Sequence, residues 1–136
     1  MAQIANLILA DGQATPANHT FVPMQPQTGT TPSQWLNKEA ASNIGYRKVS
    51  MLVKYVSNGT SKVTIRIADP VLASVPAGCC VDTNTPQVAY STFFECTFSV
   101  PYGATLQNKK DILAYAKNLL GTQVVTDAVV DMTPAW

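Results

Sequence analysis

The chain has 136 residues, of which 46% are hydrophobic and 12% are charged, with nine basic and eight acidic side chains. This length suits one domain with its own core, and the low charge favours a surface partly covered by other protein. The first residues do not resemble a secretory signal, and no run of about 18 apolar residues predicts a transmembrane helix. Three cysteines are too few for a disulfide-built scaffold, so we expect a cytoplasmic protein.

The beginning of the chain predicts two short strands. Residues 4–10 form an apolar run that ends at a turn signal, Asp11–Gly12. A second strand is expected over residues 19–24, and residues 25–34 are rich in Pro, Gly and Thr, as in a loop. Residues 35–43 fit either a helical turn or an irregular strand.

The central stretch, residues 46–67, predicts a long β-hairpin with two different faces. Side chains alternate sides along a strand, so the apolar Val49, Met51, Val53 and Tyr55 share one face, and Val63, Ile65 and Ile67 continue it on the return strand. The Asn58–Gly59 pair signals the turn, because it tolerates the positive φ of tight hairpins. The hairpin is expected to run to about Ala68, where Asp69–Pro70 marks its end.

The opposite face of this hairpin is basic. The segment holds five of the nine basic residues and none of the eight acidic ones. Lys48, Lys54, Lys62 and Arg66 share this face with Ser50, Leu52 and Thr64. We therefore interpret it as the functional surface and a polyanion as its partner, although charged strand faces are more often simply solvated.

A long loop and a third strand follow. Residues 70–87 hold three prolines and no clear periodicity, and long loops of this kind tend to be functional or mobile. Residues 88–100 alternate between an apolar face, which includes Cys96 as a core residue, and a face with Phe93 and Glu95. If this strand joins the central hairpin, Phe93 adds an exposed aromatic to the basic face, where unpaired bases could stack.

Two helices are predicted after the strands. Thr105 is a plausible N-cap for a helix over about residues 106–120, and Gly121 fits its C-cap. A second helix is expected over about 123–132. The order predicts an α+β fold: a single domain over residues 1–136, with an N-terminal hairpin at about 3–24, an antiparallel sheet at about 46–100 and helices at about 106–132. Because about 25 helical residues cannot cover so broad a sheet, we expect an obligate homodimer.

Little in the sequence indicates catalysis. His19 is the sole histidine and lacks the surroundings of a catalytic motif, so we expect a partly exposed strand residue. No metal-ligand spacing and no phosphate-binding glycine loop is present, so no metal or other cofactor is expected. Asp127 and Asp131 fit a solvated helix face. Cys79 and Cys80 could reach neighbouring subunits, but from the residues alone two free thiols are favoured.

Four stretches carry a resemblance over the full length of the chain. They are AQIANLILADGQATPANHTFVP, GYRKVSMLVKYVSNGTSKVTIRIADP, VPYGAT before the first helix, and the ending VVTDAVVDMTPAW. In this order and spacing they resemble the coat proteins of single-stranded RNA bacteriophages, the leviviruses. It implies a homodimer with helices exchanged over a ten-stranded sheet. It also implies an icosahedral shell around the RNA genome, assembled in the bacterial cytoplasm, and an inner face that grips an RNA hairpin as translational repressor and packaging signal reader.

The resemblance assigns RNA contacts to specific positions. These are Lys48, Ser50, Leu52, Lys54, Lys62, Thr64, Arg66, Phe93 and Glu95. Phe93 stands where a stacking Tyr is common, Leu52 where some relatives have a small hydroxyl in a base pocket, and Glu95 where some have an amide. A carboxylate at this place would repel phosphates, so the recognised hairpin is expected to differ from that of the best-known relatives. Cysteines in the 70–87 loop of some relatives crosslink subunits, which makes Cys79 and Cys80 candidates for inter-subunit disulfides. The alternative functions are a dimeric RNA-binding protein that forms no shell and, more remotely, an enzyme.

Overall fold

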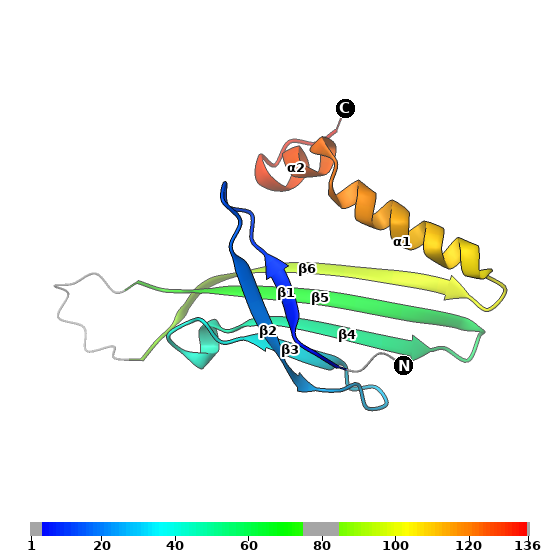
Figure 1. The fold of residues 1–136 in the computed structure, drawn as a ribbon, viewed down its shortest axis with the longest axis horizontal. Helices are drawn as coiled ribbons and strands as arrows, with labels where there is room; N and C mark the ends of the chain where they lie inside the picture. Colours follow the sequence, from blue (N-terminus) through cyan, green and yellow to red (C-terminus); the bar gives the residue numbers. More distant parts are fainter. Residues whose placement is uncertain (1–3, 75–84, 136) are drawn as a thin grey trace. The chain divides into compact units, whose positions relative to one another are not determined.

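A computed structural model describes residues 4–74 and 85–135, and within these ranges it shows a six-stranded antiparallel sheet followed by two helices (Figure 1). The strands are β1 (Leu7–Ala10), β2 (Asn18–Gln25), β3 (Ser33–Asn37), β4 (Arg47–Tyr55), β5 (Thr60–Leu72) and β6 (Val88–Pro101). A 3₁₀ turn, η1 (Asn43–Gly45), precedes β4, and the helices are α1 (Leu106–Leu120) and α2 (Gln123–Val130). The predicted α+β order, strands before helices, is confirmed.

The strands follow one another across the sheet in chain order, so each strand neighbours the one before it. The chain divides into two compact units, residues 1–99 and 100–136. The first holds most of the sheet and the second holds the helices. The single domain over residues 1–136 stays a prediction. Neither helix in the described ranges is long and apolar enough to cross a lipid bilayer.

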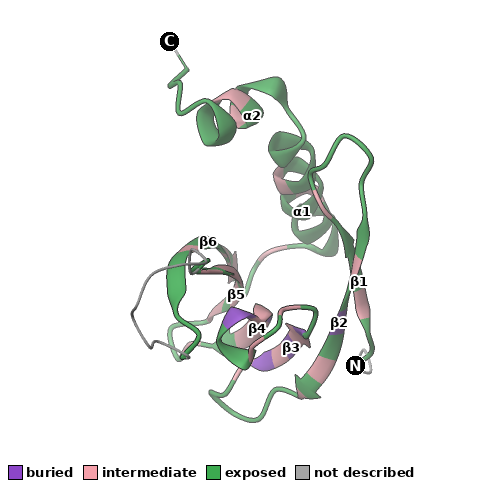
Figure 2. Cartoon of the chain, turned by 90° about the vertical axis from the view of Figure 1, so that its left-hand side faces the viewer, coloured by how far each residue is buried: buried purple, intermediate pink, exposed green. Residues whose placement is uncertain are grey.

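The core of the first unit lies where the N-terminal hairpin meets β3 and β4. Phe21, Trp35 and Val49 are buried, and Ile4, Leu7, Met51 and Ile67 pack against them. Figure 2 shows buried segments, in purple, on β2, β3 and β4. Polar bonds fix the same junction: the Trp35 indole N–H donates to the Ala5 carbonyl at 2.8 Å. Burial of aromatic and aliphatic side chains drives this packing, and the bonds satisfy the polar groups that it covers.

The central hairpin forms as its alternation predicts. Val49 pairs with Ile67, and Val53 with Val63, so the apolar side chains of both strands share one face. The turn lies at residues 56–59, and Gly59 carries the positive φ of 79°. The Asn58 side chain supports the turn by accepting a hydrogen bond from the Thr60 N–H at 3.2 Å.

Two expectations concern strand limits. Asp69–Pro70 does mark the end of the hairpin pairing, as predicted, but it does not end the strand, because β5 continues to Leu72. The pairing of β5 with β4 stops at Ala68, so the missing N–H of Pro70 removes no bond from that ladder. Residues 35–43, for which a helical turn and an irregular strand were both open, complete β3 up to Asn37, pass through residues 38–42 without helix or strand, and enter η1 at Asn43.

The helices match their predicted limits closely. The Thr105 hydroxyl accepts a hydrogen bond from the Asn108 N–H at 3.2 Å, and Gly121 occupies the C-cap of α1. No residue of α1 or α2, all of which the structure describes, is buried. Large apolar side chains of both helices, Leu113 and Val130 among them, are exposed.

The predictions for the three cysteines have different outcomes. Cys79 and Cys80 lie outside the described residues. Cys96 lies in β6 and is a free thiol of intermediate burial, outside the core cluster. Its predicted place in the core is therefore not found in the single chain, because the apolar face of β6 is largely uncovered there: Tyr90 and Phe94 are both exposed.

Candidate nucleic-acid interface

The sheet brings the predicted RNA-contact residues of β4 and β5 to one face. The register pairs Ser50 with Arg66 and Leu52 with Thr64, while Lys48 pairs with Ala68. The face is opposite to the core because Val49 and Met51 alternate with these positions. We call it the basic face and define it by Lys48, Ser50, Leu52, Lys54, Lys62, Thr64, Arg66, Phe93 and Glu95.

Two lysines lie directly opposite each other on the basic face. Lys54 of β4 and Lys62 of β5 are register partners, and both are exposed. Like charges at directly opposed positions destabilise a sheet unless an anion compensates them. The two positive charges therefore favour the binding of an anion beside them, such as a phosphate group.

The side chains of β6 complete the basic face at its edge. The Arg66 guanidinium lies over the Phe93 ring, 5.4 Å from its centroid. The Thr64 and Thr97 hydroxyls are 3.3 Å apart, which also aligns β6 beside β5. Phe93 remains 63% exposed, so its ring is accessible to a base. The condition set by the sequence, that the third strand joins the hairpin, is met.

Glu95 has a partner that the sequence does not reveal. Its carboxylate lies 3.3 Å from the Arg66 Nε, and both side chains are more than half exposed. An exposed ion pair of this kind contributes little stability. Its consequence is electrostatic, since it neutralises one of the four cations on the basic face and leaves the lysines as the uncompensated charges there.

The fifth basic residue of the central stretch belongs to the opposite face. Arg47 precedes Val49 by two positions, and its Nε binds the Asp69 carboxylate at 2.9 Å. It also lies 3.6 Å from Glu39. Four of the five basic residues of this stretch therefore lie on the basic face, which is one fewer than the count from the sequence suggests.

His19 joins this opposite charge group. Its Nδ1 lies 2.5 Å from Glu39 and its Nε2 lies 3.1 Å from Asp11, with 20% of the side chain exposed. The expectation of a partly exposed strand residue is confirmed. Because the two carboxylates bind opposite nitrogens of the ring, they do not converge on a common point. We call Asp11, His19, Glu39, Arg47 and Asp69 the charge network.

The charge network changes the pKa values of three of its members. Hydrogen bonds from the Ala17 backbone and from His19 lower the pKa of Asp11 to about 2. The carboxylates of Asp11 and Glu39 raise the pKa of His19. The neighbouring Asn37 and His19 side chains lower the pKa of Glu39. The network therefore favours charged His19 between two charged carboxylates, which ties the first turn to the start of β4.

Comparison with known proteins gives one consistent result. The sequence model of the levivirus coat protein family matches residues 2–136. The capsid protein of Pseudomonas phage PRR1 is 26% identical over 133 residues, which cover 96% of this chain and 97% of that protein.

Two solved structures extend this result. A chain from a virus-like particle of bacteriophage NT-214 is 98% identical, with a TM-score of 0.94 and coverage of 99% of this chain and 100% of that one. A chain from a virus-like particle of bacteriophage ESE058 is 29% identical, with a TM-score of 0.88 and the same coverage of both chains. The similarity thus spans the whole length of each protein.

Proposed function

The chain belongs to the levivirus coat protein family, and from this membership we propose that it dimerises and assembles into an icosahedral shell around single-stranded RNA. The full-length match to a chain found in a virus-like particle supports assembly. The observation that carries the RNA partner is the basic face, where opposed lysines and an exposed aromatic lie together.

A dimer accounts for the uncovered apolar surface of the single chain. β6 lies at the edge of the sheet, where its outer backbone groups are free to pair with another strand. Large apolar side chains are exposed on both helices, among them Leu106, Leu113 and Val130. Exposed apolar surface on this scale is typical of an interface. We infer that β6 pairs with its copy in a second chain and that the helices cover the combined sheet.

We further propose that the basic face binds an RNA hairpin and thereby acts as translational repressor and packaging signal reader. Lys48, Lys54 and Lys62 would hold phosphates, and Phe93 would stack on an unpaired base. Leu52 offers only apolar contact to a base. The Arg66–Glu95 pair reduces the positive potential beside Phe93. Both features favour a hairpin different from the one that relatives with a hydroxyl and an amide prefer.

Assembly is tested by electron microscopy of the chain expressed alone in bacteria, with nucleic acid content measured by absorbance. Closed shells that contain RNA are the expected result. Dimers that form no shells over a range of RNA and salt concentrations would instead favour a non-assembling RNA-binding protein. A coat protein family gives no support to an enzyme.

The RNA face is tested by binding measurements on dimers as a function of salt. Lys54→Ala should weaken binding and flatten the dependence of log affinity on log salt by about 0.7 to 0.9, because each phosphate contact releases about one counterion. Lys109→Ala, which removes an exposed lysine of α1, is the matched control and should leave the slope unchanged. Equal slopes for all three proteins would exclude this face.

Inter-subunit disulfides through Cys79 or Cys80 are a separate proposal, which the family resemblance suggests. Such bonds would form after release into oxidising surroundings. Non-reducing electrophoresis of particles should then show ladders that collapse on reduction and disappear in Cys79→Ser/Cys80→Ser particles. A single monomer band without reductant would contradict the crosslink.

A further inference from the structure

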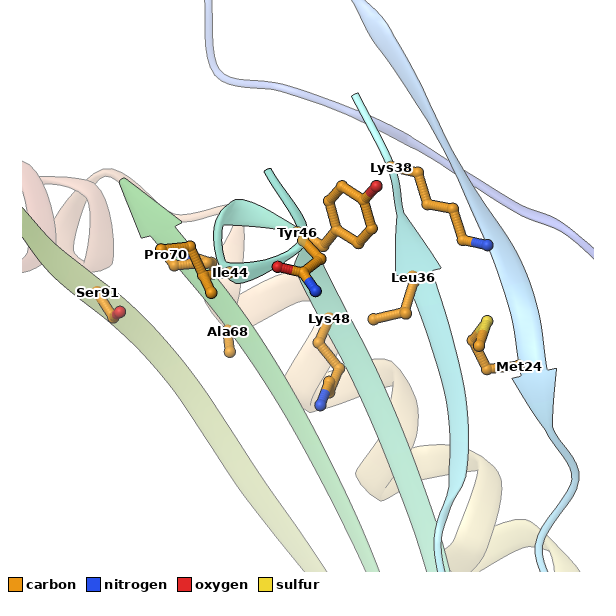
Figure 3. A pocket seen from close by; sticks show the side chains of 10 residues that line it. Met24, Leu36, Lys38, Ile44, Tyr46, Lys48, Ala68, Pro70 and Ser91 are labelled. Atoms are coloured by element: carbon orange, nitrogen blue, oxygen red, sulfur yellow. The ribbon is translucent and has the colours of Figure 1, made fainter. Parts of the chain in front are cut away.

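A cavity of about 450 Å³ lies beside the basic face, at the end of the sheet where β4 begins. Leu36, Lys48 and Ala68 form one row of register partners across β3, β4 and β5, and all three line the cavity. Figure 3 shows the Tyr46 ring and the Lys48 side chain between Leu36 on one side and Ala68 on the other. The side chain of Ile44, from η1, also lines the cavity.

The lining combines an apolar floor with positive charge. Leu36, Ile44 and Ala68 supply apolar surface, whereas Lys38 and Lys48 supply two exposed ammonium groups. Among the described residues that line the cavity, none is acidic. Glu39 follows Lys38 directly in the chain, but its carboxylate binds His19 in the charge network on the opposite face. The charge of Lys38 is therefore left for an external anion.

The cavity also continues the positive track of the basic face. Alternate residues along β4, from Lys54 through Leu52 and Ser50 to Lys48, lead from the opposed lysines to the cavity, and Lys48 belongs to both. A volume of several hundred Å³ is the usual size of a site for one small ligand. Apolar and aromatic surface flanked by cations is the arrangement that holds a base with its phosphates.

We propose that this cavity is a second nucleotide subsite, which takes one unpaired base of single-stranded RNA against Leu36, Ala68 and Tyr46. Lys38 and Lys48 hold the adjoining phosphates. The subsite extends the basic face and rests on the proposed RNA-binding function. It would hold RNA that runs past the hairpin, by contacts to the base plane and the backbone that read little sequence.

The first test measures the affinity of full-length dimers for fluorescein-labelled dodecauridylate by fluorescence anisotropy at several KCl concentrations. Lys38→Gln should weaken binding three- to tenfold and reduce the salt slope by about 0.7, the value for one phosphate contact on a single strand. Lys109→Gln, an exposed lysine of α1, should behave like the unmodified protein. Because Lys38 is exposed, the substitution should not affect folding.

The second test separates a bound base from charge alone. Ala68→Leu fills the cavity without changing charge, and its fold is checked by circular dichroism. The probes are dodecauridylate and an abasic strand of the same length. The preference for the base-bearing probe should fall several-fold in Ala68→Leu. An unchanged preference would overturn the subsite.

Three further outcomes also test the proposed nucleotide subsite. If Lys38→Gln binds like the unmodified protein while Lys54→Ala is weakened, the subsite is wrong and the RNA-binding basic face stands. If the unmodified protein binds neither probe nor structured RNA, both proposals fail. If Lys38→Gln and Ala68→Leu alter particle assembly but not RNA affinity, the cavity is a contact between copies of the chain, and the nucleotide subsite is excluded.

Discussion

At the scale of single residues, Arg66 connects the two functional parts of the basic face. It lies over the Phe93 ring and beside the Glu95 carboxylate. A phosphate that approached Arg66 would have to compete with Glu95, whereas Lys54 and Lys62 face only each other. The lysines should therefore contribute most of the salt-dependent affinity, and Arg66 should mainly position the aromatic ring.

This arrangement predicts a gain of affinity from one substitution. Glu95→Gln keeps the shape of the side chain but removes the negative charge, so Arg66 becomes available to a phosphate. RNA affinity should rise, and the slope of log affinity against log salt should steepen by about 0.7 to 0.9. Titrations of dimers with RNA at several salt concentrations measure both quantities. A weaker affinity would show that Glu95 itself contributes to RNA recognition, and an unchanged affinity would show that Arg66 does not contact a phosphate.

The charge network predicts a pH dependence at the same scale. The pKa of His19 is raised, so its stabilising contribution is complete below the unfolded value of 6.5 and is lost as pH rises through the folded value. The pKa values of Asp11 and Glu39 are lowered, so their contribution is present above unfolded values of 3.8 and 4.5 and is lost on acidification.

His19→Gln should therefore destabilise the protein most between about pH 4.5 and pH 6.5. Urea unfolding of both proteins from pH 3 to pH 9 measures the difference, which should shrink toward both ends of the range. Arg47 opposes the charge on His19 and limits the size of the effect. A difference that is constant across the pH range would refute the role of the His19 charge.

At the scale of elements, local patterns predicted most of the fold. The period of two along residues 46–67, the Asn58–Gly59 turn and the Thr105 cap are signals carried by neighbouring residues, and the structure confirms each. Asp69–Pro70 marks the end of the hairpin pairing as predicted, but β5 continues past it, because a strand tolerates Pro where the neighbouring strand does not need its N–H.

The candidate site was predictable where it depends on alternation and not where it depends on packing. Lys48, Lys54, Lys62 and Arg66 share a face because of strand periodicity alone. The charge network joins residues from Asp11 to Asp69, and no local pattern brings them together. The cavity is lined in part by η1, which begins at Asn43, the last residue of a stretch that the sequence left ambiguous.

The turn η1 packs through Gly45, and this predicts a specific loss of stability. A Cβ at Gly45 would lie 2.8 Å from Leu72 Cγ and 3.1 Å from Ala40 Cβ. Gly45→Ala should cost about 1 to 3 kcal/mol in unfolding free energy through overpacking. Gly12→Ala is the matched control, since no atom lies within 4 Å of its Cβ. Equal urea midpoints for the two variants would show that Leu72 moves away without cost.

At the scale of the whole molecule, the single chain leaves the apolar surface of β6 and both helices exposed. If a second copy covers this surface, unfolding and dissociation are one process. The apparent Tm should then rise with protein concentration, as mass action requires for an obligate dimer. Thermal scans of dimers over a hundredfold concentration range test this. A Tm that does not change with concentration would indicate a monomer that is stable alone.

The alternation of β4 also decides which genetic changes the sheet can tolerate. Core and basic side chains follow one another residue by residue, from Lys48 to Lys54. An inserted or deleted codon in this stretch would exchange the two faces beyond that point, which would turn lysines toward the core and valines toward the solvent. A length change at residues 12–17, between β1 and β2, lies outside the β4–β5 hairpin and leaves its register unchanged. Lineages of this protein should therefore diverge by substitution within this hairpin and by length in the turns outside it.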